Sequence, residues 1–137
     1  MSVINELICT EEDGTLGFGN YELAEKSKKS DYEHDGDLYK VKTFADITKL
    51  ERNGMFVYES VPGTAVHKLH ATGNGVSFEV EAKEDVQIIL GMEEDAQYKV
   101  YIQDVNVGTV KTGMGGKLVL SVETKASGTV SVKVVKL

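Results

Sequence analysis

The segment VSFEVEA, residues 76–82, decides the fold class of this chain. Val76, Phe78 and Val80 are apolar, and the residues between them are polar. An extended chain turns successive side chains to opposite faces, so this segment has one apolar face and one polar face. Such a period of two predicts a β-strand that is buried on one side and faces water on the other.

The same alternation recurs through the C-terminal half of the chain. It is present in VQIILGM, QYKVYIQ, KLVLSVE and TVSVKVVKL, residues 86–92, 97–103, 117–123 and 129–137. Short runs of turn-forming residues separate these segments, among them 73–75, 113–116 and 126–128. Many short strands with turns at this spacing are typical of a sandwich or a barrel and not of βαβ units.

The N-terminal half is less regular but also favours strands. Within residues 48–59, Asn53 and Gly54 suit a two-residue hairpin turn in which both residues have positive φ. Residues 2–8 and 20–29 have room for a helical turn or two, but neither has a sustained apolar stripe. We therefore predict an all-β protein with little helix, folded over residues 1–137 as a single-domain antiparallel β-sandwich of jelly-roll or immunoglobulin-like type.

Two resemblances accompany this pattern. Residues 98–112, YKVYIQDVNVGTVKT, followed by 115–135, GGKLVLSVETKASGTVSVKVV, resemble the terminal β-sandwich modules of many bacterial polysaccharide-processing enzymes, although Val105 replaces the glycine usual after Asp104. The whole chain, particularly TKLERNGMFVYESVPGTAVH (48–67), also resembles a family of short bacterial proteins of unknown role, some of which carry the label endosialin-like. The first resemblance implies a sandwich, and neither implies a catalytic residue.

Composition excludes several classes of partner. The chain has 22 acidic and 15 basic residues and a formal net charge of −7, which disfavours nucleic acid and anionic membrane surfaces. Lys26, Lys28 and Lys29 form the only basic cluster in the sequence, and their acidic neighbours predict a solvated loop. No segment has the length of apolar sequence that a membrane span or a secretory signal needs, so we expect a cytoplasmic protein.

The acidic stretch DYEHDGDLYK, residues 31–40, has the spacing of a calcium loop in part. Counted from Asp31, acidic residues occupy the third and fifth positions and Gly36 the sixth, but Lys42 stands where a bidentate glutamate is needed. We predict an acidic turn between two strands, and a weak calcium site in a sandwich loop remains the alternative.

Histidine and cysteine offer little catalytic chemistry. His67 and His70 are three residues apart, so on a regular strand their imidazoles face opposite sides of the sheet and cannot share one metal ion. A small metal-dependent enzyme using His67 or His70 would need carboxylates to converge on one of them. Cys9, the only cysteine, has an apolar neighbour and no recognisable partner, so we predict a buried, inert thiol and no disulfide.

Aromatic residues suggest two surfaces. In MFVYESV, regular alternation places Phe56 and Tyr58 on one face and Met55 and Val57 on the other, so both faces are apolar. This predicts a homo-oligomer built across that strand. Tyr101 lies on the polar face of its strand, opposite to the core face of Tyr98, and is a candidate for stacking on a sugar.

These observations favour a non-enzymatic binding or assembly module that forms a homo-oligomer. The alternatives are a carbohydrate-binding module and the small metal-dependent enzyme. The candidate ligand-binding residues are Tyr58, His67, His70 and Tyr101, and we expect no catalytic set, no metal site and no cofactor.

Overall fold

The computed structural model describes residues 3–124 and 128–137. Over these residues the chain forms thirteen strands and no helix, hence no helix that is long and apolar enough to cross a membrane. The turn predicted at 126–128 falls partly on residues 125–127, which lie outside the described ranges.

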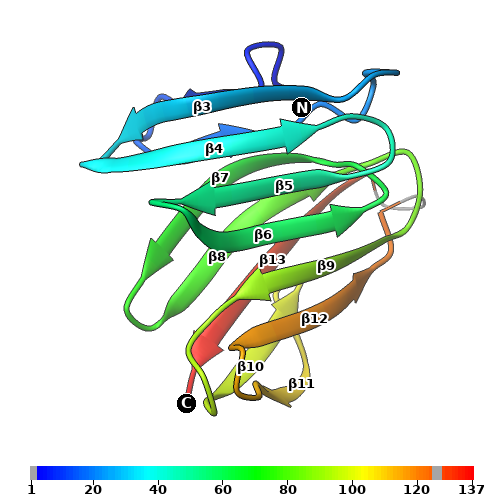
Figure 1. The fold of residues 1–137 in the computed structure, drawn as a ribbon. Helices are drawn as coiled ribbons and strands as arrows, with labels where there is room; N and C mark the ends of the chain where they lie inside the picture. The colour runs from blue at the N-terminus through cyan, green and yellow to red at the C-terminus, as the bar shows by residue number, and fades with distance from the viewer. Residues whose placement is uncertain (1–2, 125–127) are drawn as a thin grey trace.

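Two antiparallel sheets pack face to face (Figure 1). The seven-stranded sheet has the order β1 (Ile8–Thr10), β2 (Leu16–Phe18), β7 (Ala65–Thr72), β8 (Gly75–Glu81), β13 (Thr129–Lys136), β10 (Gln97–Ile102), β11 (Val105–Lys111). The six-stranded sheet has the order β12 (Lys117–Val122), β9 (Val86–Gly91), β6 (Met55–Val61), β5 (Thr48–Arg52), β4 (Asp37–Thr43), β3 (Ser27–His34). The predicted all-β antiparallel sandwich is confirmed.

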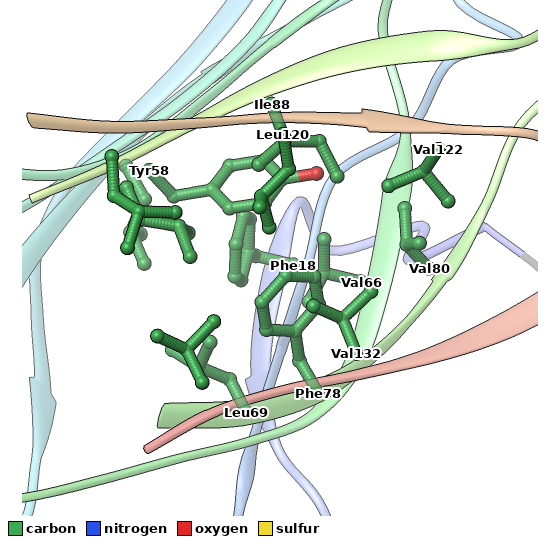
Figure 2. Close-up of a cluster of buried hydrophobic side chains, with 14 of the residues drawn as sticks. Phe18, Tyr58, Val66, Leu69, Phe78, Val80, Ile88, Leu120, Val122 and Val132 are labelled. Atoms are coloured by element: carbon green, nitrogen blue, oxygen red, sulfur yellow. The ribbon is translucent and has the colours of Figure 1, made fainter. Parts of the chain in front are cut away.

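The alternation in the sequence places the core between the sheets. Alternate residues of β8, β9, β10, β12 and β13 are buried, as in Phe78 and Val80 of the segment 76–82, whereas Val76 and Ile102 near strand ends are half-buried. Figure 2 shows Phe78, Val80 and Val132 of one sheet facing Tyr58, Ile88 and Leu120 of the other. Burying these apolar faces against each other is what holds two sheets together.

Hairpin turns follow the predicted chemistry. Asn53 and Gly54 join β5 to β6 with φ of 53° and 79°. Asp35 and Gly36 join β3 to β4 with φ of 51° and 83°. These values suit the two-residue turns that match the twist of antiparallel strands.

A bulge in β6 changes the faces predicted for MFVYESV. Leu50 of β5 pairs with Tyr58, but the next residue, Glu51, pairs with Phe56, so Val57 is an extra residue in the ladder. Directly paired residues share a face, and successive residues of β5 alternate, so Phe56 and Tyr58 lie on opposite faces of the sheet. The prediction that they share one was wrong, because it assumed an unbroken period of two.

A buried network of hydroxyl groups closes one end of the interior, where the chain passes from β6 to β7. Thr64 Oγ1 lies 2.8 Å from the Tyr58 hydroxyl and 2.9 Å from Ser60 Oγ, and the Thr64 N–H donates to Thr48 Oγ1 at 3.0 Å. Thr43 Oγ1 continues the network 2.8 Å from Thr48 Oγ1. All five residues are completely buried. Hydroxyl groups removed from water are stable only when paired in this way.

Thr64→Val should therefore destabilise the fold although it preserves the shape of the side chain. The Tyr58 and Ser60 hydroxyls would lose a buried partner, and we expect the free energy of unfolding to fall by about 1–3 kcal/mol. Denaturant titration measures the loss. Thr109→Val, the same change on the exposed strand β11, is the control and should lie within about 0.5 kcal/mol of the native protein. Equal stabilities for the two variants would contradict this account of the network.

Candidate functional site

A cleft opens between the two sheets at the end opposite to the hydroxyl network. It has a volume of about 620 Å³. The ends of four segments surround it: the β5–β6 turn, the β7–β8 turn, the end of β9 and the start of β12. Figure 1 shows the β5–β6 turn at the left and the other three ends below it. The volume lies within the range of about 300–1,000 Å³ typical of small-molecule sites.

The wall of this cleft is mainly apolar. Tyr58, Tyr98, Leu69 and Leu90 come from the buried core and contribute to its lining. Nearer to solvent the lining includes Met55, Phe56, Val57, Ala71, Val76 and Met92. The two methionines are flexible and polarisable, so they adapt to ligands of different shape. The floor is thus rigid and the mouth adaptable.

Charged groups stand at the rim of the cleft. Arg52, the only arginine of the chain, lines it and forms no ion pair within 4 Å with any residue in the described ranges. Lys117 also lines it, and its Nζ lies 5.3 Å from the centre of the Phe56 ring. Glu93 is held by Lys136, with Nζ and Oε2 2.8 Å apart. The unpaired charge at the mouth is therefore positive.

Tyr58 belongs to the core rather than to an exposed face of β6. It is completely buried, and burial raises the pKa of its phenol well above the ordinary value. Of the segment MFVYESV, Met55 and Val61 are the residues with large exposed fractions, 73% and 54%. The homo-oligomer expected from this segment stays a prediction.

His67 and His70 lie on the same face, contrary to the prediction that they diverge. Their ladder partners on β8 are Glu79 and Ser77, two residues apart, because Lys68 adds a residue to β7 and has φ of 55°. His67 is buried and its Nδ1 lies 3.1 Å from Oε2 of Glu11. Among residues 3–124 and 128–137, no three His, Cys, Asp or Glu side chains come close enough together to hold a metal ion. The metal-dependent enzyme therefore stays an untested alternative.

Tyr101 is half-buried on the outer face of the seven-stranded sheet. Its ladder partners are Lys133 and Asn106, and the row continues through Ser77 to His70. Five strands thus place polar and aromatic side chains in one line, about 19 Å long. A shallow hollow of about 260 Å³, lined by residues that include His70, Ser77 and Lys133, lies along this row. The structure therefore brings two predicted residues, His70 and Tyr101, to one surface.

The acidic stretch 31–40 spans the end of β3, a tight turn and the start of β4. Asp31 stands at an irregularity in β3 with φ of 58°, and Asp35 forms the turn with Gly36. The Asp37 carboxylate accepts a hydrogen bond from Asn53 Nδ2 at 2.9 Å, in the neighbouring hairpin. Asp31 thus lies at the irregularity in β3, Asp35 in the turn and Asp37 at the start of β4. The stretch forms a turn between two strands, as predicted.

Cys9 is half-buried on β1, directly opposite Gly17. Because Gly17 has no side chain, the Glu11 carboxylate occupies this space; a Cβ at Gly17 would lie 2.9 Å from Glu11 Oε1. Burial raises the pKa of the Cys9 thiol, and the carboxylates of Glu11 and Glu6 raise it further. Cys9 is therefore less buried than predicted, but its raised pKa leaves the thiol poorly ionised at neutral pH.

Sequence reasoning missed Arg52 and Met92. Arg52 is the last residue of β5 and precedes an Asn-Gly turn, so its presence as the only arginine was the available signal. Met92 ends a predicted strand and carried no signal of its own. Arg52 and Met92 both line the cleft because of how the two sheets pack, and the sequence does not indicate that packing.

Comparison with protein-family models, with curated proteins and with solved structures finds no match to this chain.

Cys9 should react slowly with thiol reagents. Because its pKa is raised, its thiolate fraction at pH 8 is smaller than that of a free thiol, and a disulfide reagent should modify it more slowly than glutathione. Glu11→Gln should accelerate the reaction more than Glu6→Gln, since Glu11 has the larger effect on the pKa. Glu12→Gln removes the same charge nearby and should change the rate little. A native rate equal to that of glutathione would contradict the raised pKa.

Proposed function

We propose that this protein is a non-enzymatic binding module whose ligand enters the cleft between the two sheets. The ligand is amphipathic: an apolar body lies among the apolar side chains, and an anionic group meets Arg52 at the rim. The observation that carries the proposal is the position of the only arginine, without an ion-pair partner in the described part of the chain, at the mouth of this mainly apolar cleft.

The chemistry of the lining supports an apolar body. A chain of methylene groups gains about 0.8 kcal/mol for each group moved from water into an apolar site. The buried rings of Tyr58 and Tyr98 give the inner end of the cleft a fixed shape. The Tyr98 hydroxyl accepts a hydrogen bond from the Glu93 N–H at 3.1 Å, so its polar atom is already paired. This inner end therefore favours ligands by shape and apolar contact.

The chemistry of the rim supports an anionic head group. A guanidinium presents several N–H donors in one plane, which fits a carboxylate or phosphate with two parallel hydrogen bonds. Arg52 pairs in the ladder with Tyr39, whose side chain is buried between the sheets, so Arg52 lies on the inner face of the six-stranded sheet. Its charge is thus directed to the space that the cleft occupies.

Decanoate and 1-decanol, which differ only in the head group, test both parts of the proposal. Calorimetric titration should give saturable binding of decanoate, and Arg52→Gln should weaken it about tenfold while leaving decanol binding unchanged. Ala71→Trp, at an exposed lining position, should abolish binding of both by filling the mouth. Gln87→Trp, on the outer face of β9, is the control for the added ring and should bind as the native protein does. Absence of binding by the native protein, or equal binding by Ala71→Trp, would contradict the proposal.

Binding of carbohydrate is a second candidate, supported by the row of residues from His70 to Asn106. Hydroxyl, amide, imidazole and ammonium groups in one line can bond to successive hydroxyls of a glycan, and the Tyr101 ring can stack on one sugar. The resemblance of residues 98–135 to modules of polysaccharide-processing enzymes favours the same surface.

A glycan array measures this second candidate directly. Tyr101→Ala should abolish the signal because it removes the ring, whereas Tyr101→Phe, which keeps the ring and loses the hydroxyl, should retain most of it. Signals of equal strength from the native protein and Tyr101→Ala would exclude this face as the sugar site.

A further inference from the structure

The outer face of the six-stranded sheet carries a row of lysines on three adjacent strands. Lys28 of β3 pairs directly with Lys42 of β4, which pairs directly with Lys49 of β5. Lys40, two residues before Lys42, lies on the same face. These four side chains and Glu51 line a small hollow of about 80 Å³. We call this group the lysine cluster.

The prediction that Lys26, Lys28 and Lys29 lie in a solvated basic loop was wrong for Lys28 and Lys29, which belong to a strand. Residues 27–34 form β3, and only Lys28 of the three lines the hollow. Lys26 and Lys29 instead place their Nζ atoms 5.9 Å and 5.6 Å from the ring centres of Phe44 and Tyr32.

Most of the positive charge in the cluster is unpaired. Lys49 Nζ lies 4.0 Å from Glu51 Oε2, and Glu59 of β6 is the ladder partner of Lys49 on its other side. Lys28, Lys40 and Lys42 form no ion pair within 4 Å with any residue that the structure describes. The hollow is therefore lined by four cations and one anion, 4 − 1 = +3, in a chain whose net charge is −7.

Such an arrangement is unfavourable in the free protein. Like charges placed directly opposite one another destabilise a sheet, and here three stand in one row. Glu51 is the ladder partner of Lys40 and Glu59 that of Lys49, whereas Lys28 and Lys42 have no acidic ladder partner. An anion in the hollow would turn this repulsion into attraction.

We infer that the lysine cluster binds a phosphate or sulfate group. Ammonium groups are compact, strongly charged donors that suit a tetrahedral oxyanion of high charge density, whereas a planar carboxylate fits arginine better. The strands β4 and β5 have ladder partners on both sides, so their backbone N–H groups are engaged in the sheet, and recognition there comes from the side chains and depends on charge. The hollow lies on an open sheet face, which leaves room for the remainder of a phosphate or sulfate ester.

This site is independent of the cleft. Glu51 lies on the outer face of the six-stranded sheet and Arg52 on its inner face. Arg52→Gln should therefore leave binding at the lysine cluster unchanged, and failure of one proposal does not bear on the other.

Titration with inorganic phosphate and with glycerol 3-phosphate, at ionic strength held constant with sodium chloride, tests the inference. Amide chemical shifts of β3, β4 and β5 should change in a saturable manner. Lys42→Gln and Lys40→Gln, the latter at an exposed position, should each weaken binding at least about tenfold, whereas Lys99→Gln, on the other sheet, should not. An ester bound at least as tightly as the free ion assigns an attached phosphate, and weaker binding of the ester assigns the ion itself.

Thermal unfolding separates this role from a merely structural one. Without phosphate and at low salt, Lys42→Gln should raise the unfolding midpoint, because it removes a repelling charge. Phosphate should raise the midpoint of the native protein but not that of Lys42→Gln. No saturable shift with either ligand, or equal binding by the native protein and both lysine variants, would overturn the inference.

Discussion

The burial of Tyr58 between the two sheets is the contact on which the rest of the interior depends. Its ring, carried by the six-stranded sheet, meets Phe18 and Phe78 of the seven-stranded sheet edge to face, with centroids 5.1 Å and 5.7 Å apart. Its hydroxyl needs a partner because no water reaches it, and Thr64 provides one. The same side chain contributes to the lining of the open cleft. One residue thus separates the closed end of the interior from the open end.

The class of the fold could be predicted because burial on one face imposes a period of two on each strand, and residues 76–82 have that period without interruption. The faces of individual residues were predictable only where a strand is regular. Lys68 adopts a positive φ without being glycine, and Val57 is an extra residue in a run that is apolar throughout. Neither Lys68 nor Val57 is a residue type that indicates a bulge in the sequence. Each bulge reverses the face of the residues beyond it, which is why His70 and Phe56 were misplaced.

The candidate sites could be predicted less well than the fold, for a related reason. The cleft is formed by residues far apart in the sequence, such as Arg52, Ala71 and Met92, and they meet only because two hairpin turns, the end of β9 and the start of β12 lie together. The lysine cluster depends on the register of two hairpin pairings, which aligns Lys28 with Lys42 and Lys49. The spacing of Lys40 and Lys42 indicates that they share a face. Neither residue indicates which strands pair with β4, so Lys28 and Lys49 could not be placed beside them.

Both faces of the six-stranded sheet carry positively charged side chains. Asp and Glu outnumber Lys and Arg by 22 to 15, yet the six-stranded sheet carries cations that form no ion pair within 4 Å with the described residues: Arg52 toward the interior, and Lys28, Lys40 and Lys42 of the lysine cluster toward water. Repulsion within such a group lowers the stability of the free protein, and a bound anion would restore it. Arg52 stands beside apolar side chains and suits the head group of an amphipathic molecule. The lysines stand in a polar hollow and suit an oxyanion bound by charge alone. If both proposals hold, the same sign of charge would select different ligands, because the surroundings of each cation differ.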